Sequence, residues 1–341
     1  MRTTRRAGLL PLLGLAVCGC QPPAAPPPAD PPPEAASGPP AVAPRVTIDT
    51  KIPPLVSIVT LHNLSISADG RRVAVCDDFN VVNRVNAQVW DVAGPKKVDE
   101  FENGRNFVAL SPDGATVIYY PRRGVTARPV GGGKEQQLGL HGGRLTLSPA
   151  GDRLAMTADQ GGYVWNLKAE DGLFLGGERP GTFEQALSNF FDDGRKIATG
   201  DNKGVVTVWD VNTGKATHSF DTKFGAAFTN LELFASPDGK YLAAQRRELK
   251  VFELPSGRVV QEFEPSDLTV YGTRLVFLPD GRTLLLARRN HSITLLDIAT
   301  RQPRASLNGH TKEICAMTAT PDGKTLVSAD HAGLVMVWDV P

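Results

Sequence analysis

Short stretches in which apolar and polar residues alternate recur from residue 55 to the end of the chain. In the stretch GVVTVWDVNTGK, residues 204–215, apolar side chains occupy Val206, Val208 and Val211, and turn-forming residues follow directly. Alternation with a period of two predicts a strand with one buried face, and the Asn-Thr-Gly cluster predicts the turn that ends it. The chain is therefore predicted to consist of short strands joined by turns.

A turn of the type x-Pro-Asp-Gly recurs through this region. Proline fixes φ at the second position, aspartate suits the third, and glycine relaxes the exit of the turn. One strand precedes each turn, such as TRLVFL at 273–278, and another follows it, such as KYLAAQ at 240–245. A repeat at this spacing indicates a solenoid or a propeller. The turn glycines lie 37 to 45 residues apart, at Gly70, Gly114, Gly151, Gly194, Gly239, Gly281 and Gly323.

A third strand in each repeat ends on a large apolar residue followed by an acidic or amide residue. The pairs are Trp90-Asp91, Trp165-Asn166, Trp209-Asp210, Phe252-Glu253, Leu296-Asp297 and Trp338-Asp339, with Arg128 as the exception in the second repeat. The period, the turn and the Trp-Asp terminus together resemble the WD40 repeat family. Over about residues 55–341, this resemblance implies an all-β, seven-bladed β-propeller of four-stranded antiparallel blades.

The last repeat lacks a fourth strand of its own, because the sequence stops at Val340-Pro341 directly after the third one. We expect a strand from the N-terminal side to complete this blade and close the ring. The segment LVSIVT at 55–60 lies at a suitable offset and is predicted to pair near Trp338. Such closure removes an open sheet edge that other chains could otherwise join.

Two departures from the family pattern change the expectation for the blade interiors. The Gly-His dipeptide of the family occurs cleanly only at Gly309-His310. The resemblance also implies an aspartate six residues before the tryptophan, bonded to that histidine and to a strand serine, but Lys203 and Ala332 stand there. We therefore predict that this hydrogen-bonded set is absent and that apolar packing stabilises the blades. The second repeat, with Arg128, is the least regular.

The first nineteen residues predict an export signal, because three arginines precede an apolar run too short to span a bilayer. The sequence Val17-Cys18-Gly19-Cys20 resembles the lipobox of bacterial lipoproteins, which implies lipidation at Cys20; an ordinary cleaved signal is the alternative. Residues 21–44 hold eleven prolines and predict an extended spacer. The predicted domains are an export signal at 1–19, a lipid attachment site and Pro-rich linker at 20–44, and a propeller at 45–341.

The charge balance argues against a nucleic-acid partner, since 37 Lys and Arg stand against 36 Asp and Glu. A nearly neutral chain lacks the basic excess that attracts phosphate backbones. The motifs HExxH, GxSxG and CxxC do not occur. Residues 131–134, Gly-Gly-Gly-Lys, have the glycines of a phosphate loop, but Glu135 replaces the Ser or Thr, so a surface loop is predicted. We predict no catalytic residues and no cofactor.

The histidines and cysteines suggest two further sites, and the simpler interpretation is favoured for each. His62, His141 and His310 precede first strands and could share a metal, but they stand at different offsets from the turn glycines, so no metal site is predicted. Cys76 and Cys315 fall on strands of the first and last repeats, which are neighbours in a closed ring. A disulfide is conceivable in an exported protein, but buried free thiols are expected.

A charged residue recurs at the end of the second strand in every repeat, seven or eight residues after the turn glycine. In a propeller this position leads into the loop between the second and third strands, at one face of the ring. Exposed turns favour single charges anyway, but three arginine pairs favour a partner-binding face. The residues are Asp77 with Asp78, Arg122 with Arg123, Asp159, Asp201, Arg246 with Arg247, Arg288 with Arg289, and Asp330.

These features favour a non-enzymatic, monomeric propeller that binds a protein or an acidic peptide on its charged face. Its predicted location is the periplasm or the outside of a bacterial cell, with a lipid anchor as its membrane contact. One alternative is a binder of anionic polysaccharide or cell-wall material, whose affinity added salt would abolish. Another is a propeller hydrolase or quinone-dependent dehydrogenase, which would bring histidines or carboxylates to the central channel.

Overall fold

A computed structural model describes residues 40–51, 61–77, 85–103, 107–121, 124–158, 161–175, 184–224, 231–246, 248–263 and 275–341. These residues belong to one compact unit, Pro39–Pro341. They form strands and turns, and no helix among them is long and apolar enough to cross a membrane. The all-β prediction is confirmed for this part of the chain.

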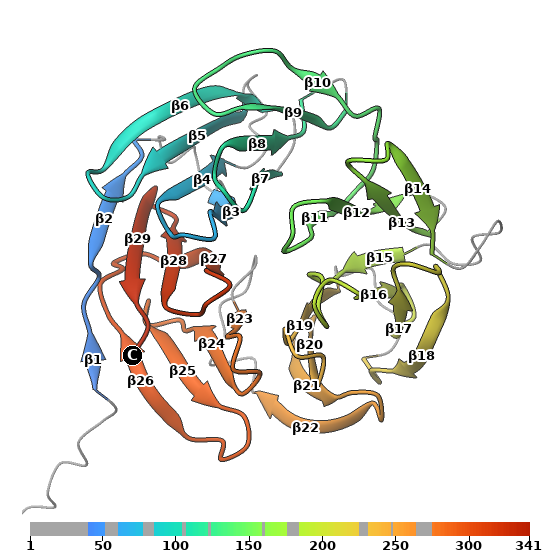
Figure 1. Cartoon of the computed structure of the whole chain (residues 1–341). Helices are drawn as coiled ribbons and strands as arrows, with labels where there is room; N and C mark the ends of the chain where they lie inside the picture. Colours follow the sequence, from blue (N-terminus) through green and yellow to red (C-terminus); the bar gives the residue numbers. More distant parts are fainter. Residues whose placement is uncertain are drawn as a thin grey trace, which may run out of the picture. The chain divides into compact units, whose positions relative to one another are not determined.

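Seven sheets, each with four antiparallel strands, follow one another along the chain, and Figure 1 shows them arranged around a ring. Blade one consists of β3 (Leu61–Ile66), β4 (Arg72–Asp77), β5 (Val85–Asp91) and β6 (Lys96–Asn103). Blade two consists of β7 (Val108–Leu110), β8 (Thr116–Tyr119), β9 (Thr126–Pro129) and β10 (Gln136–Gln137). Blade three consists of β11 (Leu145–Leu147), β12 (Arg153–Ala158), β13 (Gly161–Asn166) and β14 (Asp171–Phe174). Blade four consists of β15 (Glu184–Leu187), β16 (Lys196–Asp201), β17 (Val205–Asp210) and β18 (Ala216–Asp221).

The remaining blades keep this order, in which the first strand of each blade lies nearest the centre (Figure 1). Blade five consists of β19 (Glu232–Ala235), β20 (Tyr241–Gln245), β21 (Leu249–Glu253) and β22 (Arg258–Phe263). Blade six consists of β23 (Leu275–Phe277), β24 (Thr283–Ala287), β25 (Ile293–Asp297) and β26 (Pro303–Leu307). Blade seven consists of β27 (Ile314–Ala319), β28 (Thr325–Asp330) and β29 (Leu334–Asp339), completed by β2 (Val46–Asp49). The seven-bladed propeller is therefore confirmed, and the second repeat forms a regular four-stranded blade.

An N-terminal strand closes the ring as predicted, but it is not the predicted segment. β2 pairs antiparallel with β29, with Val46 opposite Val337 and Asp49 opposite Leu334. Ile48 is 1% exposed because its side chain enters the core between blades seven and one, whereas its neighbours in β2 face outward. Burial of Ile48, together with Val46 packed against the same cluster, fixes the register. The segment 55–60 lies outside the described residues.

A second short strand precedes the closing one. β1 (Ala41–Val42) runs parallel to β26 and adds a fifth strand to blade six. The backbone amides of Ser306 and Asn308 each donate to a carbonyl of this segment, at 3.0 Å to Pro40 and 3.0 Å to Val42. The paired structure therefore begins before residue 45, inside the segment that the sequence assigns to the linker.

The seven turn glycines join the first and second strands of their own blades and also contact the neighbouring blades. All seven have a positive φ, between 63° and 76°, which favours glycine. Each also faces the turn of the preceding blade: a methyl group at Gly281 would lie 2.2 Å from an Asp238 carboxylate oxygen. The series closes where Gly70 of blade one faces Thr320 of blade seven, at 3.6 Å. The turns thus form a ring of contacts at one end of the blades.

Candidate partner-binding face

The charged positions at the ends of the second strands are partly described. Asp201, Arg246, Arg288, Arg289 and Asp330 lie where the sequence places them, at or just after the ends of β16, β20, β24 and β28. Asp77 ends β4, but its side chain lies outside the described part of the chain. The other predicted residues that lie outside it are Asp78, Arg122, Arg123, Asp159 and Arg247.

Asp330 belongs to a buried hydrogen-bond network inside blade seven. His310 Nδ1 lies 2.8 Å from Asp330 Oδ2, and His310 Nε2 lies 2.7 Å from Ser328 Oγ. Trp338 Nε1 donates to the same Ser328 oxygen at 2.8 Å. The prediction that this set is absent is therefore wrong for blade seven. The aspartate stands at the end of β28 rather than at Ala332, because the turn amides of Ala332 and Leu334 hold its carboxylate there, at 2.9 and 3.1 Å.

Asp201 has the corresponding place in blade four. Its Oδ1 accepts hydrogen bonds from the amides of Lys203 and Val205, at 2.9 and 2.8 Å. Asp201 is 7% exposed and Asp330 is fully buried. The expectation of exposed negative charges at these two positions is therefore wrong. A buried carboxylate needs hydrogen-bond donors, and here the backbone amides of the turn that follows each aspartate supply them.

The described arginines of the face lie on the adjacent blades five and six. Arg246 Nη2 donates to the carbonyl of Asn202 in blade four at 3.1 Å, so this side chain bridges two blades. Arg288 Nε donates to Thr294 Oγ1 at 3.3 Å, and Arg289 is exposed. Of the predicted charges that the structure describes, the positive ones therefore reach the surface and the negative ones do not.

The structure also shows where the histidines of the possible metal site and the two cysteines of the possible disulfide lie. His310 is buried in its network, His141 is exposed, and the His62 side chain lies outside the described residues. No group of three or more His, Cys, Asp or Glu side chains that could hold a metal occurs among the described residues. Cys76 and Cys315 are buried thiols that form no disulfide, and Cys315 Sγ donates to the carbonyl of Ala329 at 3.3 Å.

The Gly-rich loop at 131–134 has an observed role of a different kind. The amide of Gly131 donates to Asp99 Oδ2 of β6 at 2.8 Å, so the loop is joined to blade one. Its glycines have positive φ values and lie at the surface, and β10 rather than a helix follows. The interpretation as a surface loop therefore agrees with the structure.

An ion pair that the sequence did not predict occupies the irregular position of blade two. Arg128 Nη2 lies 2.9 Å from Asp99 Oδ1 of blade one, and the two side chains are 6% and 7% exposed. The Arg128 guanidinium also lies over the Phe101 ring, 4.7 Å from its centroid. The arginine at the tryptophan position was visible in the sequence as an exception to the repeat. Its partner was not, because Asp99 lies 29 residues away on another blade.

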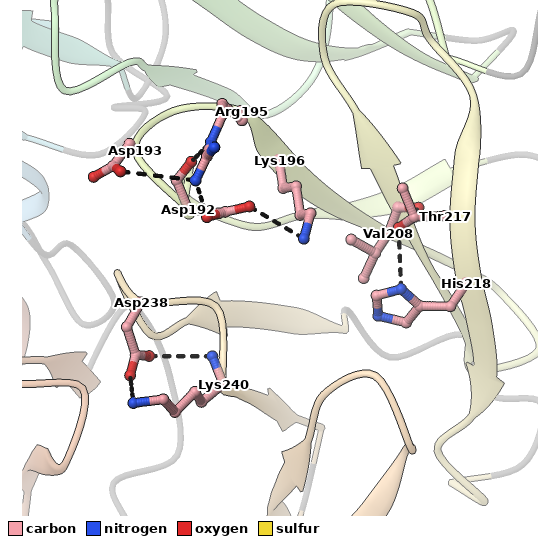
Figure 2. A network of polar contacts seen from close by, with 9 residues as sticks. All are labelled: Asp192, Asp193, Arg195, Lys196, Val208, Thr217, His218, Asp238 and Lys240. Atoms are coloured by element: carbon pink, nitrogen blue, oxygen red, sulfur yellow. Dashed lines mark hydrogen bonds and ion pairs between the residues drawn. The ribbon is translucent and has the colours of Figure 1, made fainter.

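The opposite end of the blades carries the turns that hold the repeat glycines. Figure 2 shows two of them: in blade four, Arg195 and Lys196 both pair with Asp192, at 2.5 and 3.1 Å, and in blade five Lys240 pairs with Asp238 at 2.9 Å. Burial and the nearby Lys196 lower the pKa of His218 on β18. These contacts join residues within single turns or neighbouring strands.

Comparison with known proteins agrees with the repeat. The family described as WD domain, G-beta repeat matches residues 301–339. The chain is 24% identical over 199 residues to Periodic tryptophan protein 2 of Arabidopsis thaliana, a match that covers 57% of this chain and 21% of that protein. It is 28% identical over 137 residues to WD repeat-containing protein SL1-17 of Schistosoma mansoni, covering 40% of this chain and 44% of the relative.

A third relative is Small ribosomal subunit protein RACK1z of Oryza sativa subsp. japonica, 30% identical over 113 residues, which cover 31% of this chain and 33% of that protein. The chain thus spans between 21% and 44% of the length of these three relatives. Together with the seven blades, the matches support a WD40 propeller.

Proposed function

We propose that this chain is a non-enzymatic scaffold that binds a protein partner through the blade ends carrying Arg246, Arg288 and Arg289. The WD-repeat relatives suggest a propeller of the protein-interaction kind. The observation that carries the finer proposal is the division of charges on this face. Asp201 and Asp330 are buried in their own turns, whereas on two adjacent blades Arg246 and Arg288 are half-buried and Arg289 is exposed.

The chemistry of these arginines indicates an acidic partner. A guanidinium group binds a carboxylate through two parallel hydrogen bonds, so a set of arginines selects a segment rich in Asp or Glu. Each exposed contact contributes only about 0.5–1 kcal/mol, so the set has to act together. Arg246 and Arg288 are held by Asn202 and Thr294, which reduces the side-chain entropy lost on binding.

We further propose that the propeller is exported and attached to a bacterial membrane through a lipid on Cys20, as a monomer. The proposal is supported by the residues alone: an apolar run, the lipobox-like Val17-Cys18-Gly19-Cys20, and eleven prolines in 21–44. Replacing Cys20 with Ser should release the protein from the membrane fraction. Membrane attachment without an acyl chain would contradict the anchor.

The test of the binding face is a charge reversal with a matched control. The variant Arg246→Glu/Arg288→Glu/Arg289→Glu should lose the proteins that crosslink to the full chain in intact cells. The control Lys96→Glu/Lys168→Glu/Lys215→Glu makes the same charge change at exposed turns on the other end of the blades, and should keep them. Equal capture by both variants would refute the face.

The same arginines could bind an anionic polysaccharide, and two probes separate the cases. Polyglutamate represents an acidic peptide and alginate an anionic glycan. Preferential binding of polyglutamate that persists at physiological salt supports the protein partner, whereas binding of alginate that disappears with added salt supports the glycan.

A further inference from the structure

Six of the seven turns between first and second strands contain an Asp-Gly step, and in five of them hydrogen bonds hold both the aspartate side chain and the glycine amide. In blade two, Asp113 Oδ1 accepts hydrogen bonds from Ser111 Oγ at 2.6 Å and from the Ala115 amide at 2.9 Å, and the Gly114 amide donates to the Ser111 carbonyl at 2.8 Å. Equivalent bonds hold three of the other four; in blade six Leu278 takes the place of the Ser, and the Thr283 hydroxyl donates to Asp280 Oδ2 at 2.6 Å instead. The four steps are Asp69-Gly70, Asp238-Gly239, Asp280-Gly281 and Asp322-Gly323.

The turn of blade four is the exception. Phe191 occupies the position of the Ser or Thr, and Lys196 occupies that of Thr283 in blade six, so the turn lacks a hydroxyl group that would donate to Asp193. The Asp193 side chain is 96% exposed, and its single contact among the described residues is a long ion pair with Arg195 Nη2, at 3.8 Å. Figure 2 shows the Arg195 guanidinium between the two carboxylates, and its shorter contact, at 2.5 Å, is with Asp192.

The glycine amide of this turn is unrestrained as well. The turn bond is shifted by one residue: the Arg195 amide donates to the Asp192 carbonyl at 3.0 Å. Within the described part of the chain, the Gly194 amide therefore donates to no acceptor, unlike the other six turn glycines. Asp192 and Asp193 also both have a positive φ, 52° and 53°, a strained region for residues with a Cβ.

We propose that the step Asp193–Gly194 is a site of spontaneous isoaspartate formation. The Gly194 amide nitrogen attacks Cγ of the protonated Asp193 carboxyl group. A C–N bond forms, a C–O bond breaks, and the carboxyl hydroxyl leaves as water with the amide proton. Solvent water then opens the succinimide ring. Attack at Cγ restores aspartate, and attack at the main-chain carbonyl carbon gives isoaspartate, whose backbone has one more methylene group.

The surroundings of this step leave room for the reaction. It borders a hollow of about 130 Å³ between blades three and four, also lined by Ser148, Asp152 and Asn212. Gly194 has the loosest contact in the ring of turns, since a methyl group there would lie 3.7 Å from Pro149. Water therefore reaches both reacting groups. A longer turn would displace Asp192, whose amide donates to the Pro237 carbonyl of blade five at 2.8 Å.

Other steps of related chemistry are distinguishable in the same measurement. Asp171–Gly172 lies in the paired strand β14. Asn308–Gly309 would first deamidate and gain one mass unit, and its glycine is packed against Trp338, 3.1 Å from a methyl group placed there. Asn103–Gly104 extends beyond the described residues. Isomerisation of Asp193 changes no mass.

The test ages the folded full chain for weeks at mildly acidic pH and maps isoaspartate by peptide fragmentation and by isoaspartyl-specific methylation. Asp193 should accumulate isoaspartate at least about tenfold faster than any of the five restrained aspartates, because their hydrogen bonds must open first. Asp193→Glu should remove the signal, since a six-membered ring forms far less readily. Ser111→Ala should raise isoaspartate at Asp113 above its level in the unchanged chain.

The unfolded chain, aged in denaturant, is the control for sequence context. There the six Asp-Gly steps of the turns should react at similar rates. The proposal is overturned if Asp193 in the folded chain reacts no faster than Asp113, or if Asp193 is equally favoured in the unfolded chain.

Discussion

Blades seven and two fill the same position of their third strand in different ways. In blade seven, Trp338 is fully buried and donates to Ser328, which is joined to His310 and Asp330 of the same blade. In blade two, Arg128 is 7% exposed and reaches Asp99 of the neighbouring blade. One solution is internal to a blade and the other links two blades. In these two blades a buried donor therefore meets a matched acceptor, without a tryptophan in blade two, whereas Phe252 and Leu296 fill the position by apolar packing alone.

Breaking the ion pair between blades one and two should have the largest effect on stability. Arg128→Ala leaves the Asp99 carboxylate buried without its cation, and the free energy of unfolding should fall by about 3–5 kcal/mol. Denaturant unfolding measures this change. The double variant Arg128→Met/Asp99→Asn should recover most of the loss, because it removes both charges together. A double variant no more stable than Arg128→Ala would contradict the charge argument.

Breaking the hydrogen-bond network inside blade seven should have a smaller effect on stability. His310→Ala removes one partner each from Asp330 and Ser328, both fully buried, and should lower the free energy of unfolding by about 2–3 kcal/mol. His141→Ala, at an exposed histidine, is the control and should change stability by no more than about 0.5 kcal/mol. Equal losses in the two variants would show that the network contributes nothing.

High pH should weaken blade two selectively. Burial, reinforced by the hydrogen bond to Glu135, raises the pKa of Tyr119 to about 12 from its ordinary value of 10.0. The fold thus favours the neutral phenol, so the stability it provides is complete below pH 10 and is lost as the pH rises to about 12. At ~1.4 kcal/mol per pH unit the loss is about 2–3 kcal/mol. Stability measured against pH should decline less in Tyr119→Phe; parallel curves would refute this cause.

The indole hydrogen bond can be isolated in blade four. Trp209 Nε1 donates to Thr199 Oγ1 at 2.8 Å, whereas Met156 stands at the corresponding position of blade three and the buried Nε1 of Trp165 has no partner among the described residues. Thr199→Val keeps the shape and should lower the free energy of unfolding by about 1 kcal/mol. An unchanged unfolding midpoint would mean that this bond adds nothing to the stability of blade four beyond packing.

The sequence was sufficient to predict the blades, because every repeat carries a related turn that ends in glycine and strands of the same alternation. It was not sufficient to predict the closing strand. β2 has only four residues, and residues 55–60 alternate more clearly between apolar and polar positions, so the prediction chose them. The partner of Arg128 could not be found because it depends on which blades are adjacent and on side-chain direction. The charge at each strand end was visible, but not that Asp201 and Asp330 would turn inward to their own amides.

The two N-terminal strands also set how the propeller responds to a pulling force. A load applied to the chain before residue 40 reaches the two hydrogen bonds of β1 first, and β2, with its four paired residues and the buried Ile48, only afterwards. Single-molecule extension from the N-terminus should therefore show a weak rupture of a few residues before the strong one that opens blade seven. Under tension, the chain lengthens slightly at blade six while the ring stays shut.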